Sequence, residues 1–171
     1  MADIEFRREK IIQELRSRLA IAFPESQFTR GFWEDEVNEY DQFFVFELPE
    51  TSMPLRTEPT ERFVRGLEKR GWTLRTFPVG VSYWIQADPK EVYEAANSMI
   101  ERISDSIEAD ELFCNEEGNL VIKYWLDAVT IVVYDKGVLD VELVYMFQYT
   151  KEAKWVRKPF RPNTGSKTDN I

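Results

Sequence analysis

The sequence predicts a single α+β domain in which a mainly antiparallel sheet carries helices largely on one face. Segments with apolar residues at helical spacing alternate with short segments rich in aromatic and β-branched residues. Short turns join most of the strand-like segments, and such turns favour antiparallel pairing. We expect about six to seven strands and three helices in a domain at 1–150, followed by an extended tail at 151–171.

The first helix is predicted at 3–22, where apolar residues form a one-sided stripe between basic and acidic residues. Pro24 follows it and marks its end. Extended segments at 27–33 and 42–48 come next. They could pair as a hairpin with a long loop.

A loop, a short helix and a second hairpin are predicted for the middle of the chain. Three prolines in 49–59 indicate the loop, and the short helix is expected at 60–70. Strands at 72–77 and 81–87 then flank the segment 78–80, whose proline and glycine suit a tight chain reversal.

The clearest helix start lies at Asp88 and Pro89, because aspartate can cap a helix and proline fits its first turn. The helix is expected to continue to about Glu108. Turn signals then separate three strands of an antiparallel meander, predicted at 120–126, 129–134 and 138–148.

The chain contains no histidine, and this absence narrows the chemistry that is available to it. It excludes catalytic triads, histidine-ligated zinc sites and histidine proton shuttles. Cys114 is the only cysteine, and we interpret it as a small buried hydrophobic residue near a strand end. The spacing of the seven glycines matches neither the Walker loop nor the dinucleotide-binding loop, the two standard phosphate-binding motifs. We therefore assign no catalytic residue, cofactor or metal, and an enzyme is the less favoured class.

Carboxylates leave one catalytic alternative open. A magnesium-dependent hydrolase could use acidic residues of the carboxy-terminal meander together with a lysine. The candidates are Asp127, Asp135, Asp140, Glu142 and Lys123. Their expected strand and turn positions do not converge, so this is the weakest of three functional hypotheses.

The charge is uneven along the chain. Residues 151–171 carry six basic and two acidic side chains, a net charge of +4, so the formal charge of −9 leaves −13 on residues 1–150. Such a body repels nucleic acid and favours a protein partner with a basic surface. No apolar run approaches the roughly 20 residues that cross a bilayer. We therefore expect a cytoplasmic protein with no membrane contact.

Three groups of side chains are candidates for binding. An acidic segment with flanking aromatics is either a solvated loop or a docking loop: Trp33, Glu34, Asp35, Glu36, Glu39 and Tyr40. Strand alternation places a second group on the sheet face opposite the core: Arg75, Trp84, Lys123, Trp125, Asp140 and Glu142. That face is either a contact surface or is covered by the first helix or the tail.

The tail supplies the third group, Trp155, Arg157, Lys158, Phe160 and Arg161. It is either a disordered terminus, a segment that docks on the acidic body of the same or a neighbouring subunit, or a nucleic-acid contact. Docking on a neighbouring subunit would make the protein a homo-oligomer.

The leading hypothesis is a non-enzymatic acidic protein-binding module, such as an inhibitor or a regulatory subunit. Its basis is the missing histidine, the acidic body and the tryptophans expected on the second sheet face. The alternative is an α+β cup that binds a small ligand in an aromatic-lined pocket. A deep closed pocket would favour the cup, whereas a flat aromatic face would favour the protein-binding module.

Overall fold

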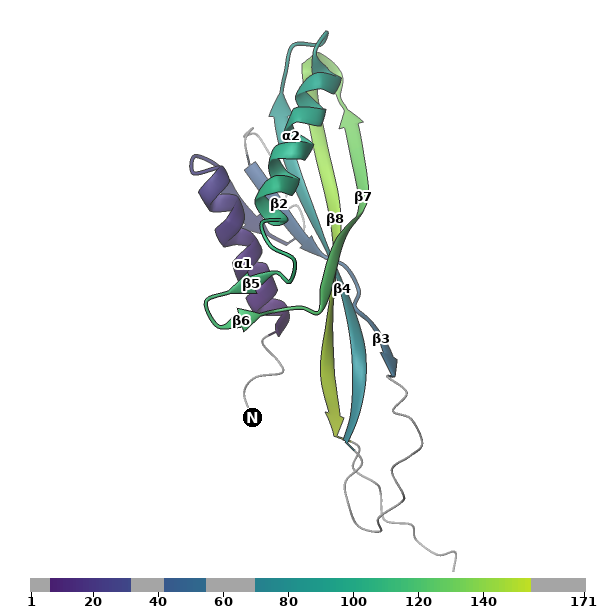
Figure 1. Cartoon of the computed structure of the whole chain (residues 1–171). Helices are drawn as coiled ribbons and strands as arrows, with labels where there is room; N and C mark the ends of the chain where they lie inside the picture. Colours follow the sequence, from purple (N-terminus) through teal and green to yellow (C-terminus); the bar gives the residue numbers. More distant parts are fainter. Residues whose placement is uncertain (1–6, 32–41, 55–69, 155–171) are drawn as a thin grey trace, which may run out of the picture.

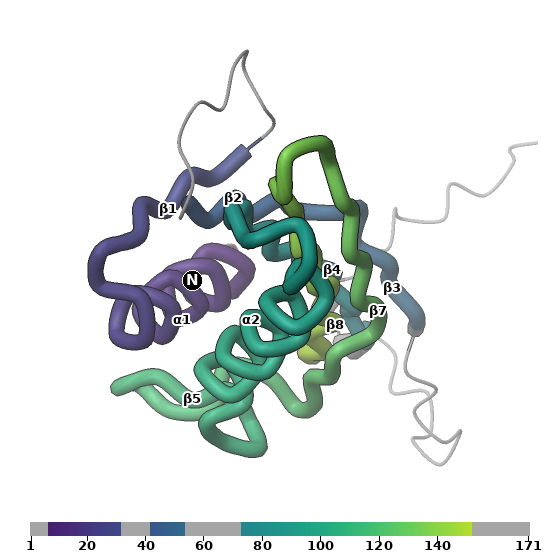
Figure 2. The backbone as a smooth tube through the Cα atoms, turned by 90° about the horizontal axis from the view of Figure 1, so that it is seen from above, coloured from purple at the N-terminus to yellow at the C-terminus, as the bar shows by residue number. Residues whose placement is uncertain are grey.

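The computed structural model describes residues 7–31, 42–54 and 70–154, which form a six-stranded mixed sheet with two helices on one side (Figures 1 and 2). The helices are α1 (Arg7–Ala22) and α2 (Val92–Ile107). The sheet contains β1 (Gln27–Arg30), β2 (Gln42–Glu47), β3 (Thr51–Pro54), β4 (Arg70–Gln86), β7 (Lys123–Val133) and β8 (Val138–Lys154). A separate small hairpin consists of β5 (Cys114–Asn115) and β6 (Gly118–Asn119). The predicted α+β class is confirmed.

The sheet has the strand order β1-β2-β4-β8-β7, and β3 pairs with β4 beyond the end of β2. Its centre is the antiparallel pair β4 and β8, whose register runs from Arg70 opposite Lys154 to Gln86 opposite Val138. The remaining pairs are antiparallel, apart from β1 with β2, which is parallel. Figure 1 shows the lower parts of β3, β4 and β8 extending beyond the helices.

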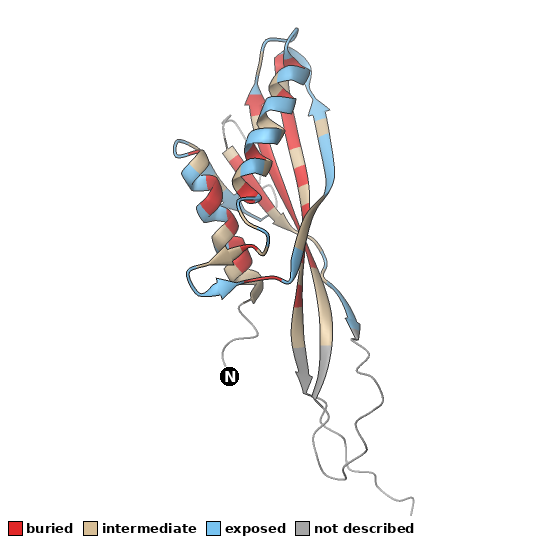
Figure 3. Ribbon diagram, in the orientation of Figure 1, coloured by how far each residue is buried: buried red, intermediate tan, exposed pale blue. Residues whose placement is uncertain are grey.

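The core lies between the helices and one face of the sheet. Both predicted helical stripes are buried there, Ile11, Ile12, Leu15 and Leu19 from α1 and Val92, Ala96, Ile103 and Ile107 from α2. Alternate residues of β4 and β8 complete the core, including Phe77, Val79, Val81, Leu143, Tyr145 and Phe147. Each fully buried Val, Leu, Ile or Phe side chain contributes roughly 1.5–3 kcal/mol through its removal from water. The helices are thereby fixed to one side of the sheet (Figure 3).

Arg18 of α1 is the charged exception within this core, with 8% of its surface exposed. Its guanidinium donates to Ile107 O at 2.7 Å, to Cys114 O at 3.0 Å and to Asp110 Oδ2 at 2.6 Å. It also lies 4.2 Å from the centre of the Phe113 ring. Arg18 therefore joins α1 to the segment that follows α2. The amphipathic pattern did not predict this role.

The predicted hairpin around 78–80 is wrong, because β4 is continuous through this segment. Pro78 lies where β4 changes partner from β2 to β3, and its carbonyl accepts from Leu48 N at 3.0 Å. The N–H that proline lacks is therefore not needed by either ladder. Gly80 makes room for the Phe46 ring, since an added Cβ would lie 2.0 Å from its Cζ. Both residues are explained by packing rather than by a turn.

Three other strand predictions need correction. The expected hairpin of 27–33 with 42–48 is a parallel pair, because the chain between β1 and β2 is long enough to return to the same end of the sheet. The predicted loop at 49–59 contains β3. The expected strands at 120–126 and 129–134 form one strand, β7, with a bulge between Leu126 and Ala128. The hairpin of 129–134 with 138–148 is confirmed.

Two helix predictions also differ from the structure. The short helix predicted at 60–70 lies outside the described residues, apart from Arg70, which begins β4. The second described helix begins at Val92, four residues after Asp88, whose Oδ1 accepts from Lys90 N at 2.9 Å in a preceding turn. None of the helices in the described ranges is long and apolar enough to span a membrane.

Cys114 is half-buried in β5 rather than a core residue, and its Sγ lies 2.8 Å from Asn119 Oδ1. The first four residues assigned to the tail, 151–154, belong to β8. The other tail residues, Trp155, Arg157, Lys158, Phe160 and Arg161 included, lie outside the described residues.

Candidate protein-binding face

The second side of the sheet carries no described helix, and we call it the open face (Figure 2). It is formed by the alternate residues of four neighbouring strands that point away from the core. They are Gln42, Phe44 and Phe46 of β2, Ser82 and Trp84 of β4, Asp140, Glu142 and Val144 of β8, and Ala128, Thr130 and Val132 of β7. Tyr134, directly after β7, joins them through its contact with Trp84.

Trp84 and Tyr134 stack across β8 at the end of this face. Their ring centres are 5.2 Å apart and their planes differ by 24°. Because β8 lies between β4, which carries Trp84, and β7, which Tyr134 directly follows, the two rings meet above β8. Asp140, directly opposite Trp84 in the register, is buried there with 8% of its surface exposed. This arrangement places a carboxylate next to a stacked aromatic pair.

The two carboxylates of this face are perturbed by their surroundings. Burial raises the pKa of Asp140, and hydrogen bonds from Ser82 Oγ, 2.6 Å from Asp140 Oδ1, and from the Trp84 side chain partly offset that effect. Burial also raises the pKa of Glu142, and the neighbouring charge of Asp140 adds to this shift. Both groups are held in positions that disfavour their charged forms. A cation brought to this face would relieve that penalty.

Replacing Asp140 by asparagine is expected to raise the free energy of unfolding at pH 7 by about 1 kcal/mol. The folded state binds a proton to Asp140 more tightly than the unfolded chain does, so wild-type stability rises as the pH falls through the folded-state pKa. Asparagine imitates the protonated form and keeps an acceptor for Ser82. Urea unfolding at pH 7 and at acidic pH measures the effect.

The higher stability of Asp140→Asn relative to wild type should disappear at pH values below the ordinary carboxyl pKa, because Asp140 is then protonated in both the folded and the unfolded state. Glu101→Gln, at an exposed position within α2 and away from its ends, is the matched control and should leave the stability unchanged. A loss of stability in Asp140→Asn at pH 7 would show that the charge of Asp140 stabilises the fold.

Lys123 and Trp125 form a second cluster at the other end of the open face. Lys123 Nζ lies 5.0 Å from the centre of the Trp125 ring, and Trp125 Nε1 donates to Asp127 Oδ1 at 3.3 Å. Trp125 is opposite Met146, six residues along β8 from Asp140, which corresponds to roughly 20 Å. The two tryptophans therefore share a face without forming one site.

Arg75 does not lie on the open face, which corrects its predicted position. It is opposite Tyr149 on the side that faces the helices, and its Nη1 is 3.3 Å from Glu50 Oε1. The prediction assumed a turn at 78–80, and a turn there shifts the alternation by one residue. A continuous β4 places Arg75 on the same side as Phe77.

The acidic segment of Trp33, Glu34, Asp35, Glu36, Glu39 and Tyr40 lies outside the described residues. Within the ranges that the structure describes, no group of three or more Asp, Glu, Cys or His side chains could hold a metal ion. Asp127 lies at the bulge of β7 and Asp135 lies in the turn after β7, whereas Asp140 and Glu142 lie within β8. The structure does not bring the carboxylates proposed for magnesium together.

Sequence reasoning missed the aliphatic side chains and several aromatic side chains of the open face, among them Phe46, Val132 and Tyr134. Tyr134 is 45% exposed and Val132 is 38% exposed. A signal was present in the sequence, since residues 129–133 are apolar or β-branched at every position and not only at alternate ones. If only the helix-covered face of the sheet were apolar, apolar residues would be expected only at alternate positions of this strand.

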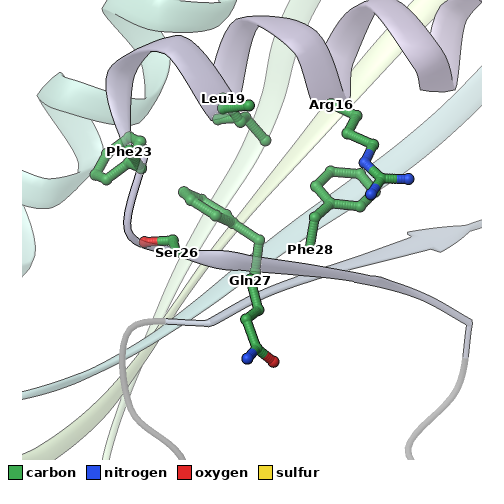
Figure 4. Close-up of a pocket in the computed structure, with 8 residues that line it drawn as sticks. Arg16, Leu19, Phe23, Ser26, Gln27 and Phe28 are labelled. Carbon is green, nitrogen blue, oxygen red and sulfur yellow. The ribbon is translucent and has the colours of Figure 1, made fainter.

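A hollow of about 390 Å³ lies between α1 and β1 (Figure 4). Its walls include Leu19, Phe23, Phe28 and Phe43, and Arg16 is 5.4 Å from the Phe28 ring centre. The small-ligand hypothesis would place a ligand here. The hollow opens to solvent, whereas a deep closed pocket would favour that hypothesis.

No protein-family model matches this chain. No curated protein matches it either. Among solved structures, the chain is similar to a component of the "Virion of native gene transfer agent (GTA) particle", with 14% sequence identity and a TM-score of 0.43. The similarity covers 82% of this chain and 92% of that one. A similarity of this size does not indicate a function.

Proposed function

We propose that this protein is a non-catalytic binding module that acts on a protein partner, as an inhibitor or a regulatory subunit, through the open face. The observation that carries the proposal is the stacked pair of Trp84 and Tyr134 above the buried Asp140. Aromatic side chains with a polar end provide much of the binding energy at protein interfaces. Here they lie on a sheet face that no described helix covers.

The composition of the open face supports a protein partner. Partly exposed Trp84, Val132 and Tyr134 provide apolar contact area, and the two perturbed carboxylates provide specificity for a cation. Burial of the charged Asp140 carboxylate opposes folding. Groups whose burial costs stability in this way are frequent at functional sites. The formal charge of −9 favours association with a basic surface.

Affinity capture from the native host, followed by mass spectrometry, tests this function. Wild type is compared with Trp84→Ala and with Tyr93→Ala, which removes an aromatic side chain that is 66% exposed on α2. A specific partner should be recovered with wild type and Tyr93→Ala. Its recovery should fall strongly with Trp84→Ala, because that variant removes half of the stacked pair. Equal recovery with all three proteins, at matched folding, would refute the role of the open face.

A further inference from the structure

Strand β7 forms an outer edge of the sheet. The strand order ends with it, and among the described strands none lies beyond it. Its upper part is exposed, with fractions of 42% for Val129, 38% for Val132 and 43% for Val133 (Figure 3). An outer strand that is apolar and solvent-exposed is a template for another strand.

The backbone groups of this edge are arranged for pairing. Tyr134 N donates to Val138 O at 2.7 Å, which makes these two residues a hydrogen-bonded pair. Hydrogen-bonded and non-hydrogen-bonded pairs alternate along an antiparallel ladder. The N–H and C=O groups of Val129, Ile131 and Val133 are therefore directed away from β8, toward the outer side of the sheet.

The sequence of this segment lacks two features that protect edges in many proteins. Residues 128–133 contain no proline and no charged side chain. The bulge at Leu126 and Ala128 lies before them, so the rest of the strand is regular over six residues. A strand added at this edge could therefore form a regular ladder of backbone hydrogen bonds with residues 128–133.

We infer that β7 is completed by an extended segment of a partner protein that carries a basic side chain toward the open face. This inference deepens the proposed function and rests on it. The register places Thr130 beside Glu142 and Val132 beside Asp140. A residue of the added strand opposite Thr130 would have its Cα about 10 Å from that of Glu142. Lysine or arginine there reaches over the short Thr130 side chain to the carboxylate.

The charges near this edge favour such a strand over a second copy of the chain. Asp127 and Asp135 flank the uncharged segment, and among the described residues the nearest cations along the chain are Lys136, in the turn after β7, and Lys123, at the start of β7. A second β7 would bring an uncharged segment with its own aspartates and leave Glu142 without a cation. Antiparallel self-pairing around Ile131 would also set Asp127 near the other copy's Asp135. Charge complementarity therefore selects a basic strand.

Two synthetic heptapeptides test the inference, with acetylated and amidated ends and alternating Thr and Val. One carries Lys at its fifth position and the other carries Glu there. The Lys peptide should bind at least about tenfold more tightly than the Glu peptide, and it should shift the amide resonances of Val129, Ile131 and Val133. Glu142→Gln should remove most of that preference, because it removes the charge and keeps the shape.

Backbone pairing is tested separately with a Lys peptide whose alternate amides are methylated. It should not bind, because it cannot donate to the ladder, and this control leaves the protein unchanged. Ile131→Pro should block the Lys peptide as well, and the β8 ladder does not use the Ile131 N–H. Equal binding of the methylated peptide, no Lys preference, or no binding of either peptide at millimolar concentration would overturn the inference. Self-association that Ile131→Pro abolishes would overturn it in favour of a second copy.

The two proposals can fail independently. If partner capture depends on Trp84 but the Lys peptide does not bind β7, the proposed function stands and the strand addition is wrong. If the Lys peptide binds as described while capture is indifferent to Trp84, the edge is a binding site and the stacked aromatic pair is not.

Discussion

Replacing Arg18 by methionine is expected to lower the free energy of unfolding by about 3–5 kcal/mol. Methionine fills a similar length and restores no hydrogen bond. The carbonyls of Ile107 and Cys114 would lose their donor, and the Asp110 carboxylate would lose its cation. A buried acceptor that loses its donor keeps the full penalty of leaving water.

Arg16→Met is the matched control, because Arg16 lies on the same helix and is exposed. Its effect on urea unfolding should stay within about 0.5 kcal/mol. The double variant Arg18→Met, Asp110→Asn should recover part of the loss, since it removes the uncompensated charge. A loss below about 1 kcal/mol in Arg18→Met would mean that the buried arginine does not hold α1 to the segment after α2.

Replacing Gly137 by alanine is expected to destabilise the protein by about 3 kcal/mol. Gly137 has a φ of +76°, and an added Cβ would lie 2.0 Å from the carbonyl oxygen of Ala87. That oxygen is part of the backbone, and the Gly137 carbonyl accepts from Ala87 N at 2.8 Å. The close approach therefore cannot relax without opening the end of the β4 and β8 pair, next to Tyr134.

Gly80→Ala provides the comparison for this second variant. Its added Cβ would also lie 2.0 Å from another atom, but that atom is the end of the Phe46 side chain, which can rotate away. The expected loss is about 1 kcal/mol. Thermal and urea unfolding of both variants measure the difference. Equal losses would show that the turn at Gly137 tolerates a side chain.

Periodicity predicted the elements whose apolar residues all face one core. The stripes of α1 and α2 are of this kind, because their burial pattern follows from local spacing. The hairpin of β7 with β8 was predicted instead from the turn residues between them. The continuity of β4 could not be predicted in this way. Pro78 and Gly80 are typical turn residues, and only the change of strand partner and the position of Phe46 explain them.

The same limit applies to the candidate site. Alternation placed Trp84, Asp140 and Glu142 correctly on one face, because each lies within a strand whose register the core fixes. It could not place Tyr134, which reaches Trp84 across β8 only because β4 and β7 flank that strand. The neighbours of a strand are set by chain topology, and local spacing carries no information about them.

The central claim is that the open face binds a protein, and calorimetric titration of the captured partner into purified wild type, Trp84→Ala and Tyr93→Ala tests it most directly. We predict a dissociation constant at least about 30-fold higher for Trp84→Ala than for wild type, as expected when an interface loses a central aromatic residue. Tyr93→Ala should bind as wild type does. A folded Trp84→Ala protein whose dissociation constant is within about twofold of wild type would contradict the claim.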